Sequence, residues 1–307
     1  MIAQISKRIF YFVLVNVLVT VTITAILAVF HVGSYLPEGG LGWLAAFCLL
    51  WGFGAAFISL ALSRLMAKWF MGVRVVPPDT SDPVLGELVE TVHGLARQAG
   101  LPALPEVGIY QSAEVNAFAT GPSRARALVA VSTGLLGRMR QKEVLGVLGH
   151  EVTHIANGDM VTMTLIQGVV NAFVMFLSRV LAFALSQAMR SRDDDRGGGS
   201  WLMQFLFIQV FQVVFGILGY IVVCQFSRWR EFRADAGGAR LAGRGNMIDA
   251  LRALQRLANP EASRAEAQRS QGFQSLKISG SGNRLLALFS THPPLEQRIA
   301  RLEHGIF

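Results

Sequence analysis

Residues 148–155 read Leu-Gly-His-Glu-Val-Thr-His-Ile, a stretch that carries two histidines four positions apart and a glutamate directly after the first. On an α-helix, residues four apart share one face, so His150 and His154 can both reach a single ion. Neutral imidazoles suit Zn²⁺, which in catalytic sites takes three protein ligands and a water. Glu151 is placed to accept a proton from that water. The stretch therefore predicts half of a hydrolytic zinc site on a buried helix.

The third ligand has to come from elsewhere in the chain. A histidine six residues after His154 would complete one known type of zinc site, but that position is Met160. A carboxylate on a later helix is the other common solution, and Glu231 in "SRWREFRADAGGARLAG" is the strongest candidate. Asp235 follows on the same helical face. Charged residues beside arginines are ordinarily solvated, so Glu231 is favoured only because the histidine pair lacks a ligand.

The composition is typical of a membrane protein with a sizeable water-facing part, because 52% of the 307 residues are hydrophobic. The formal net charge is +8, but the basic residues lie mainly beside apolar segments, which favours membrane orientation over nucleic-acid binding. The two cysteines, Cys48 and Cys224, both fall inside apolar runs. Neither a disulfide framework nor a cysteine metal site is therefore expected.

Four apolar runs are long enough to cross a bilayer, which takes about 20 helical residues. The first could instead be a signal peptide, but its apolar core is too long and lacks a clear cleavage site. Lys and Arg flank the first two runs on one side only, so the positive-inside rule places the N-terminus and both polar blocks in the cytoplasm. The four runs are residues 9–30, 41–63, 160–189 and 201–227.

The runs divide the chain into four parts. Residues 1–74 carry two transmembrane helices, 75–159 the first half of a cytoplasmic catalytic domain, 160–227 a helical membrane hairpin, and 228–307 the second half of that domain. Because both polar blocks are expected on the same side, they can fold together, and the hairpin brings His154 close to Glu231. Hydrophobic periodicity predicts helices at 83–98, 141–158, 228–242, 246–257 and 294–303, and strands at 107–110, 116–120 and 127–132.

One further histidine stands out from its local sequence. His292 precedes a Pro-Pro pair, and Pro294 can start the final helix. A histidine whose backbone is fixed in this way can donate a hydrogen bond to a tetrahedral oxyanion.

Five stretches of the chain, in this order, resemble the HtpX family of membrane-integrated zinc metalloproteases, which are related to the CAAX prenyl-protein endoproteases. The resemblance covers essentially the whole chain, and the motif positions show no departure from the family pattern. The stretches are "VNAFATG", "LVAVSTGLL", "GHEVTHIANGDMVTMTLIQGVVN", "FSRWREFRADAGGA" and "THPPLEQRI".

The resemblance implies roles for particular residues. His150, His154 and Glu231 would bind one Zn²⁺ per chain, with Glu151 as the catalytic glutamate and Asp235 orienting a ligand histidine. Further residues implied to line the active site are Asn116, His292 and Arg298. The strand implied to hold an extended substrate is formed by Asn116, Ala117, Phe118, Ala119 and Thr120, and the residues alone leave open that it is a plain structural strand.

The expected fold is an α+β membrane protein with four hydrophobic helices and a mostly helical, gluzincin-type zinc protease domain that contains a small β-sheet. The implied activity is a zinc-dependent endopeptidase of the bacterial inner membrane. It would degrade misfolded or damaged membrane proteins from the cytoplasmic side, in quality control and the stress response. Its partners would be protein or peptide substrates, the lipid bilayer and other membrane quality-control proteases, with no nucleic acid.

Two other functions compete with this one. A CAAX-type processing protease would cleave a lipidated C-terminus inside a membrane chamber, and a large chamber needs more helices than four crossings supply. A non-catalytic membrane scaffold would hold a structural zinc, but such sites usually fill all four ligand positions with Cys and His. That arrangement would leave Glu151 without a purpose.

Overall fold

The computed structural model describes residues 40–189, 198–258 and 290–305. The chain divides into two compact units. One comprises Met1–Ala56 and Leu165–Val223, and the other comprises Phe57–Thr164 and Cys224–Phe307. The expected apolar run at 9–30 lies outside the described residues.

The described part of the first unit consists of segments of long apolar helices, each of which continues into the second unit. Glycines allow close packing there, since a Cβ at Gly52 would lie 2.7 Å from the backbone nitrogen of Ala172. Helices in lipid commonly approach at such small residues. Three helices in the described part of the chain are long and apolar enough to cross a membrane, against the four expected. They are α3 (Gly40–Phe70), α7 (Asp159–Ala188) and α8 (Gly198–Ala242).

Helix α8 differs from its prediction, because the sequence indicated a separate helix beginning at Arg228. In the structure one continuous helix carries both the apolar run and the charged stretch that follows. Residues 220–236 contain neither Pro nor Gly, so nothing interrupts the backbone hydrogen bonds where the side chains change from apolar to charged. Glu231 and Asp235 are therefore held on the same helix as the fourth apolar run.

In the described part of the second unit, four strands form a mixed sheet with the order β1-β2-β4-β3. β2 and β4 are parallel, and the other pairs are antiparallel. β4 is buried almost throughout, whereas β3 is mostly half-buried and forms one edge among the described strands. The strands are β1 (Arg74–Val75), β2 (Glu106–Tyr110), β3 (Ala117–Ser123) and β4 (Arg126–Ser132).

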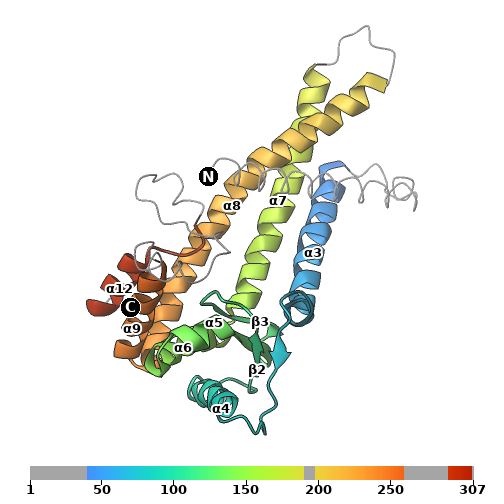
Figure 1. The fold of residues 1–307 in the computed structure, drawn as a ribbon. Coiled ribbons are helices and arrows are strands. Elements are labelled where there is room, and N and C mark those ends of the chain that lie inside the picture. The colour runs from blue at the N-terminus through green and yellow to red at the C-terminus, as the bar shows by residue number, and fades with distance from the viewer. Residues whose placement is uncertain (1–39, 190–197, 259–289, 306–307) are drawn as a thin grey trace. The chain divides into compact units, whose positions relative to one another are not determined.

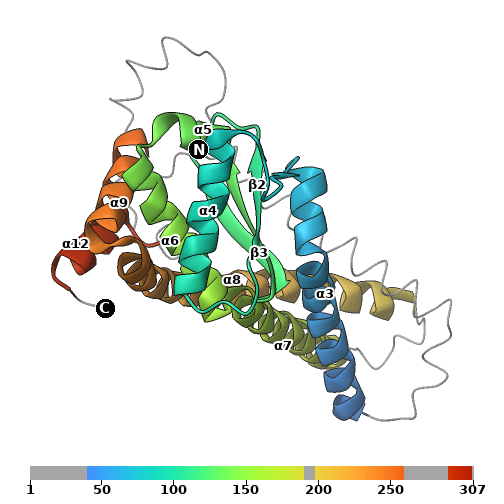
Figure 2. The same cartoon turned by 90° about the horizontal axis from the view of Figure 1, so that it is seen from below.

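The two faces of the sheet bury different side chains. Val129 and Val131 point to one face, where they join Leu148 and Val152 in the main hydrophobic core. The other face buries Leu128 and its neighbours in a smaller cluster. Figure 2 shows helices α4 (Pro83–Gln98) and α6 (Gln141–Asn157) beside the sheet, and both contribute to the main core. The alternation along β4 thus fixes which face receives the helix with the two histidines.

Helix α4 has the predicted bounds, and its start has a clear cause. The Asp82 carboxylate accepts hydrogen bonds from the backbone nitrogens of Val84 (2.9 Å) and Leu85 (3.2 Å), and Pro83 occupies the first turn. A side-chain cap satisfies backbone donors that the helix itself cannot pair, and Pro loses nothing there. The short helix α5 (Thr133–Arg138) was not predicted. It is capped by Ser132, whose Oγ accepts from the backbone nitrogen of Leu135 at 3.0 Å.

Helix α6 lies at the centre of the second unit. It packs against α4, against β3 and against α9 (Arg244–Ala258), and α12 (Leu295–Glu303) packs on α9 (Figure 1). α6 ends at Asn157, and Gly158 caps it in the left-handed conformation with φ 68° that glycine tolerates best. Helix α7 begins at the next residue, Asp159.

Candidate metal centre

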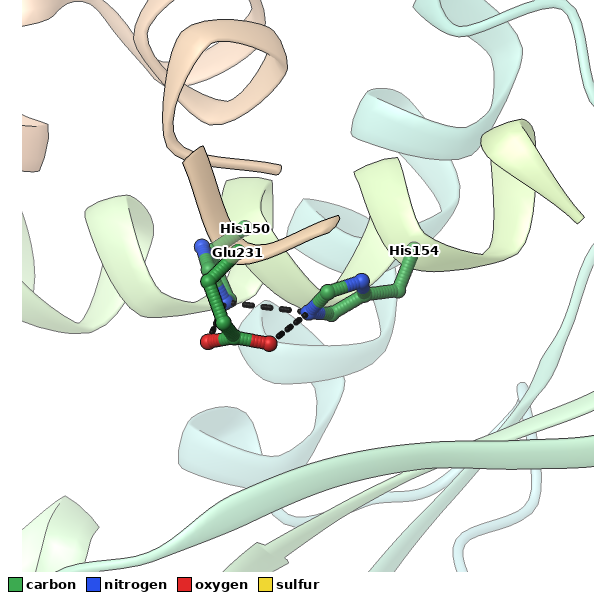
Figure 3. Close-up of side chains that lie close together, drawn as sticks. All are labelled: His150, His154 and Glu231. Atoms are coloured by element: carbon green, nitrogen blue, oxygen red, sulfur yellow. Dashed lines mark hydrogen bonds and ion pairs between the residues drawn. The ribbon is translucent and has the colours of Figure 1, made fainter. Parts of the chain in front are cut away.

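The side chains of His150, His154 and Glu231 face one another in the second unit (Figure 3). The two histidines come from α6 and the glutamate from α8. The Nε2 atoms of the histidines lie 3.1 Å apart, and the Glu231 oxygens lie 3.3 Å from His154 Nε2 and 3.5 Å from His150 Nε2. All three residues are buried, and their ligand atoms lie within 4.8 Å of one another. The cluster has the size to hold one metal ion.

Small residues at the crossing of α6 and α8 bring these side chains together. A Cβ on Gly238 would lie 3.0 Å from the backbone nitrogen of His150, and one on Gly149 would lie 2.8 Å from the Cβ of Ala242. Larger side chains would push the two helix backbones apart, because a packed interior has no spare volume. The "GG" that follows "EFRADA" therefore determines how near Glu231 comes to the histidines.

Asp235 and Arg298 lie beside the Nδ1 atom of His150. Asp235 Oδ1 lies 3.0 Å from His150 Nδ1. Arg298 of α12 donates to both oxygens of Asp235, from Nε at 2.8 Å and from Nη2 at 2.6 Å. Arg298 is itself buried, and the bidentate pair is the strong geometry for a guanidinium and a carboxylate. The structure thus places Arg298 on Asp235 and also beside the cluster, with its Nη2 3.4 Å from His150 Nδ1 and its Nη1 3.7 Å from Glu231 Oε2.

His154 is supported by Asp159, a residue that the sequence did not single out. Asp159 Oδ2 lies 2.6 Å from His154 Nδ1, and Asp159 is only 4% exposed. A sequence signal was present, since Asp159 is the only acidic residue between Glu151 and Asp193 and directly precedes an apolar run. Each histidine of the cluster therefore has a carboxylate of its own on Nδ1.

The donor set fits a cation. When both Nδ1 atoms donate to their carboxylates, the neutral imidazoles turn unprotonated Nε2 atoms toward each other and toward Glu231. Lone pairs 3.1 Å apart beside a buried carboxylate repel one another unless a proton or a metal ion lies between them. Two imidazoles and a glutamate form one of the ligand sets that hold catalytic zinc. These residues therefore fit Zn²⁺.

The pKa values of the histidines reflect the same crowding of negative charge. Burial lowers the pKa of His150, but its hydrogen bonds to Asp235 and Glu231 outweigh burial and raise the pKa to about 9. Burial also lowers the pKa of His154, and Asp159 and Glu231 again reverse the effect, so that this pKa is raised. In the absence of a metal ion, both imidazoles thus hold a second proton more strongly than an ordinary histidine does.

His292 lies at the open side of the cluster. Its Nδ1 is 2.8 Å from Glu231 Oε2, and its side chain is 64% exposed. The Ser290 hydroxyl donates to the backbone oxygen of His292 at 2.6 Å, and Arg228 donates to the backbone oxygen of Ser290 at 2.9 Å. The loop that carries His292 is therefore tied to the same helix as Glu231.

Glu151 is half-buried on α6. Burial lowers the pKa of Arg298, but its hydrogen bonds to Asp235 and the negative charges of Asp235, Glu231 and Glu151 raise the pKa. Glu151 therefore lies within electrostatic reach of the cluster.

Asn116 lies just before the edge strand, which was predicted to begin at this residue. Its backbone nitrogen donates to Ser132 Oγ at 3.1 Å, and its backbone oxygen accepts from the Ser132 nitrogen at 2.9 Å. Because one of these partners is a side chain, regular pairing begins one residue later, at Ala117. Asn116 is exposed, and Ala117, Phe118, Ala119 and Thr120 follow it along β3. The structure packs β3 against the helix that carries the histidines.

Known proteins resemble this chain over most of its length. The model of peptidase family M48 matches residues 85–306. A protein named Protease HtpX homolog from Bacillus pumilus is 50% identical over 97% of this chain and 99% of its own length. Proteins of the same name from Bacillus subtilis (strain 168) and Methylacidiphilum infernorum are 50% and 47% identical, again over 97% of this chain.

A solved structure shares the fold. The crystal structure of S. mikatae Ste24p has a TM-score of 0.57 to this chain and covers 93% of it, with 67% of that protein matched at 16% sequence identity. The family match and the full-length relatives confirm the resemblance on which the sequence interpretation rested. The chain belongs to peptidase family M48 and is an HtpX-type membrane metalloprotease.

Proposed function

We propose that the protein is a zinc-dependent endopeptidase that binds one Zn²⁺ per chain through His150, His154 and Glu231. The observation that carries this proposal is the buried convergence of these three side chains. Each histidine has a carboxylate on Nδ1, which leaves its Nε2 directed at the other two side chains. Structural zinc sites are usually closed by four Cys and His ligands, whereas a His₂Glu set leaves a position for water.

Four residues of the chain have proposed roles in the reaction. Zinc, when bound, supplies a Lewis acid that polarises the scissile carbonyl and lowers the pKa of its water to about 7. Glu151 accepts a proton from the attacking water and passes it to the leaving amine. His292 donates a hydrogen bond to the oxyanion that develops on the substrate. Asp235 orients His150, and Arg298 acts through Asp235 as a positioning residue.

The proposed substrate site is the edge strand that begins at Asn116. An extended peptide adds to an exposed sheet edge through backbone hydrogen bonds, which place little demand on its side chains. Two features support this site. β3 is an edge among the described strands, and it packs against α6, which carries the two histidines. Backbone recognition suits unfolded substrates of varied sequence. Asn116 would contact the substrate backbone at the start of this strand.

The proposed setting is the bacterial inner membrane, with the catalytic domain on the cytoplasmic side. Support comes from the three long apolar helices and from the basic residues at the end of the first of them, Arg64 and Lys68. Residues 75–159 and 228–307 would form the cytoplasmic domain, joined by the membrane segment 160–227. In this setting the enzyme would degrade misfolded or damaged membrane proteins, together with other quality-control proteases.

The test is cleavage of a denatured membrane protein by the purified full-length chain in detergent. Wild-type protein should cleave it, a zinc chelator should stop cleavage, and added Zn²⁺ should restore it. Glu151→Gln should bind zinc and fail to cleave. A protein that cleaves equally well with chelator would contradict the zinc mechanism, and cleavage of a prenylated peptide alone would favour the processing protease. Zinc binding without any cleavage would favour the scaffold.

A further inference from the structure

The two histidines of the cluster rest on carboxylates from different elements. Asp235 is on α8, which crosses α6, whereas Asp159 is the first residue of α7. The contact of Asp159 with His154 Nδ1, at 2.6 Å, is shorter than the 3.0 Å contact between Asp235 and His150. We infer that Asp159 is a positioning residue that fixes the tautomer and the ring orientation of His154. The inference rests on the proposed zinc site.

The geometry of the imidazole explains the role. The two ring nitrogens lie on different sides of the ring, so in the neutral imidazole a carboxylate that accepts from Nδ1 leaves Nε2 unprotonated. In the structure His154 Nε2 lies 3.3 Å from Glu231 Oε1 and 3.1 Å from His150 Nε2, which is where a metal ion would be held. A carboxylate that accepts from a ligand histidine also makes that ligand more basic.

Burial makes the contact hard to replace. Asp159 is 4% exposed, and a buried carboxylate without a hydrogen-bond donor is strongly disfavoured. His154 Nδ1 can supply such a donor, so the ring and the carboxylate hold each other in place. Rotation of the His154 ring away from the cluster would leave Asp159 without that donor.

The junction between α6 and α7 holds Asp159 beside His154. A single residue, Gly158, separates the two helices, and its backbone nitrogen donates to the Ile155 oxygen at 3.0 Å. Its own oxygen accepts from the nitrogens of Val161 and Thr162, each at 3.1 Å. Asp159 therefore cannot move relative to His154 without moving the first turn of α7. Because α7 is long and apolar enough to cross a membrane, the start of a candidate membrane helix is bonded to a ligand of the metal site.

A purely structural role for Asp159 makes a different prediction. An acidic residue in the first turn of a helix interacts favourably with the positive end of the helix dipole, and Asp159 occupies that position in α7. If this were its only role, substitution would lower stability and leave metal affinity unchanged. The two roles are therefore separated by measuring zinc affinity and stability in the same variants.

The experiment uses the full-length protein with Asp159→Asn and Asp159→Ala. Zinc affinity is measured by competition with a chromogenic chelator, and the site geometry is read from the visible absorption of the Co²⁺-substituted protein. Loss of an outer partner of a metal-bound histidine typically weakens metal binding about 10- to 100-fold. We expect about 10-fold for the Asn variant, about 100-fold for the Ala variant, and an altered Co²⁺ spectrum in both.

Asp82→Ala is the matched control, because Asp82 is also an acidic residue at a helix start but lies outside the cluster. It should lower thermal stability and leave zinc affinity and the Co²⁺ spectrum as in wild type. Wild-type affinity and spectrum in Asp159→Asn would overturn the inference while leaving the proposed function intact. If the Ala variant does not fold, the Asn variant, which keeps the side-chain shape, decides. Failure of the wild-type protein to bind zinc would instead overturn the proposed function.

Discussion

His150 and His154 lie one turn apart on the same helix, yet different parts of the chain support them. Asp159, which contacts His154, is only 5 positions away in the sequence. The supports of His150 come from α8 and from Arg298 of α12, which is 148 positions away. The His154 half of the cluster is therefore local, and the His150 half requires that the C-terminal helix is in place.

The difference has a consequence for assembly. The contact between His154 and Asp159 can form as soon as the α6–α7 junction folds, because all of its atoms come from neighbouring residues. The contact between His150 and Asp235 needs α6 and α8 to pack together first, and its support by Arg298 also needs α12. A change on the His150 side should therefore disturb the docking of helices, whereas a change on the His154 side should act mainly on metal affinity.

The largest stability effect should come from Arg298→Ala. This change leaves the Asp235 carboxylate buried without the guanidinium that holds both of its oxygens. Breaking a buried ion pair in this way costs about 3–5 kcal/mol of unfolding free energy. Chemical denaturation of the purified protein would measure the loss. Arg298→Lys should recover part of it, because lysine keeps the charge but cannot bind both oxygens in the same way. An Ala variant as stable as wild type would contradict the claim that the His150 side depends on the C-terminal helix.

A smaller effect is expected at the start of α6, which carries both histidines. The Glu143 carboxylate accepts from the Arg140 backbone nitrogen at 2.8 Å and from Arg256 Nη2 at 2.7 Å. Burial raises the pKa of Glu143, but these hydrogen bonds outweigh burial and lower it from 4.5. A lowered pKa stabilises the folded protein above pH 4.5, and this contribution is lost as the pH falls through the lowered folded-state pKa.

Glu143→Gln should therefore lower the unfolding free energy by about 0.5–1 kcal/mol at pH 7. The difference from wild type should shrink as the pH falls below about 4. Thermal unfolding at several pH values would measure it. Because Glu143 acts on α6 as a whole, zinc affinity should stay as in wild type. If Glu143→Gln lost as much zinc affinity as is expected for the Asp159 variants, zinc affinity would depend on the stability of α6 as a whole. The carboxylates beside the two histidines could then not be credited with an effect of their own.

Elements with strong local signals could be predicted from the sequence. Short strand-like segments between turn residues predicted β2 and β4, and helical spacing of apolar residues predicted α4 with the observed bounds. The spacing of His150 and His154 placed them on one helical face, as the structure has them. In these segments the local preference and the final packing agree, so a short window of sequence is enough.

The remaining features depend on contacts between distant residues. The two-residue strand β1 and the six-residue helix α5 are too short for a periodic pattern. The parallel pairing of β2 with β4, which puts β3 at the edge, is a property of the whole sheet. Asp159 was missed because an Asp after Asn-Gly is typical of an ordinary turn, and only the left-handed Gly158 turns it back onto His154.

The most direct test of the metal centre is the zinc content of protein purified without added metal. One zinc per chain is expected in the wild type and in Glu151→Gln, since Glu151 is not a proposed ligand. Glu231→Ala should lose its zinc, because Glu231 is the one carboxylate among the described residues whose oxygens face both Nε2 atoms. One zinc per chain in the Glu231→Ala variant, or none in the wild type, would contradict a centre built from His150, His154 and Glu231.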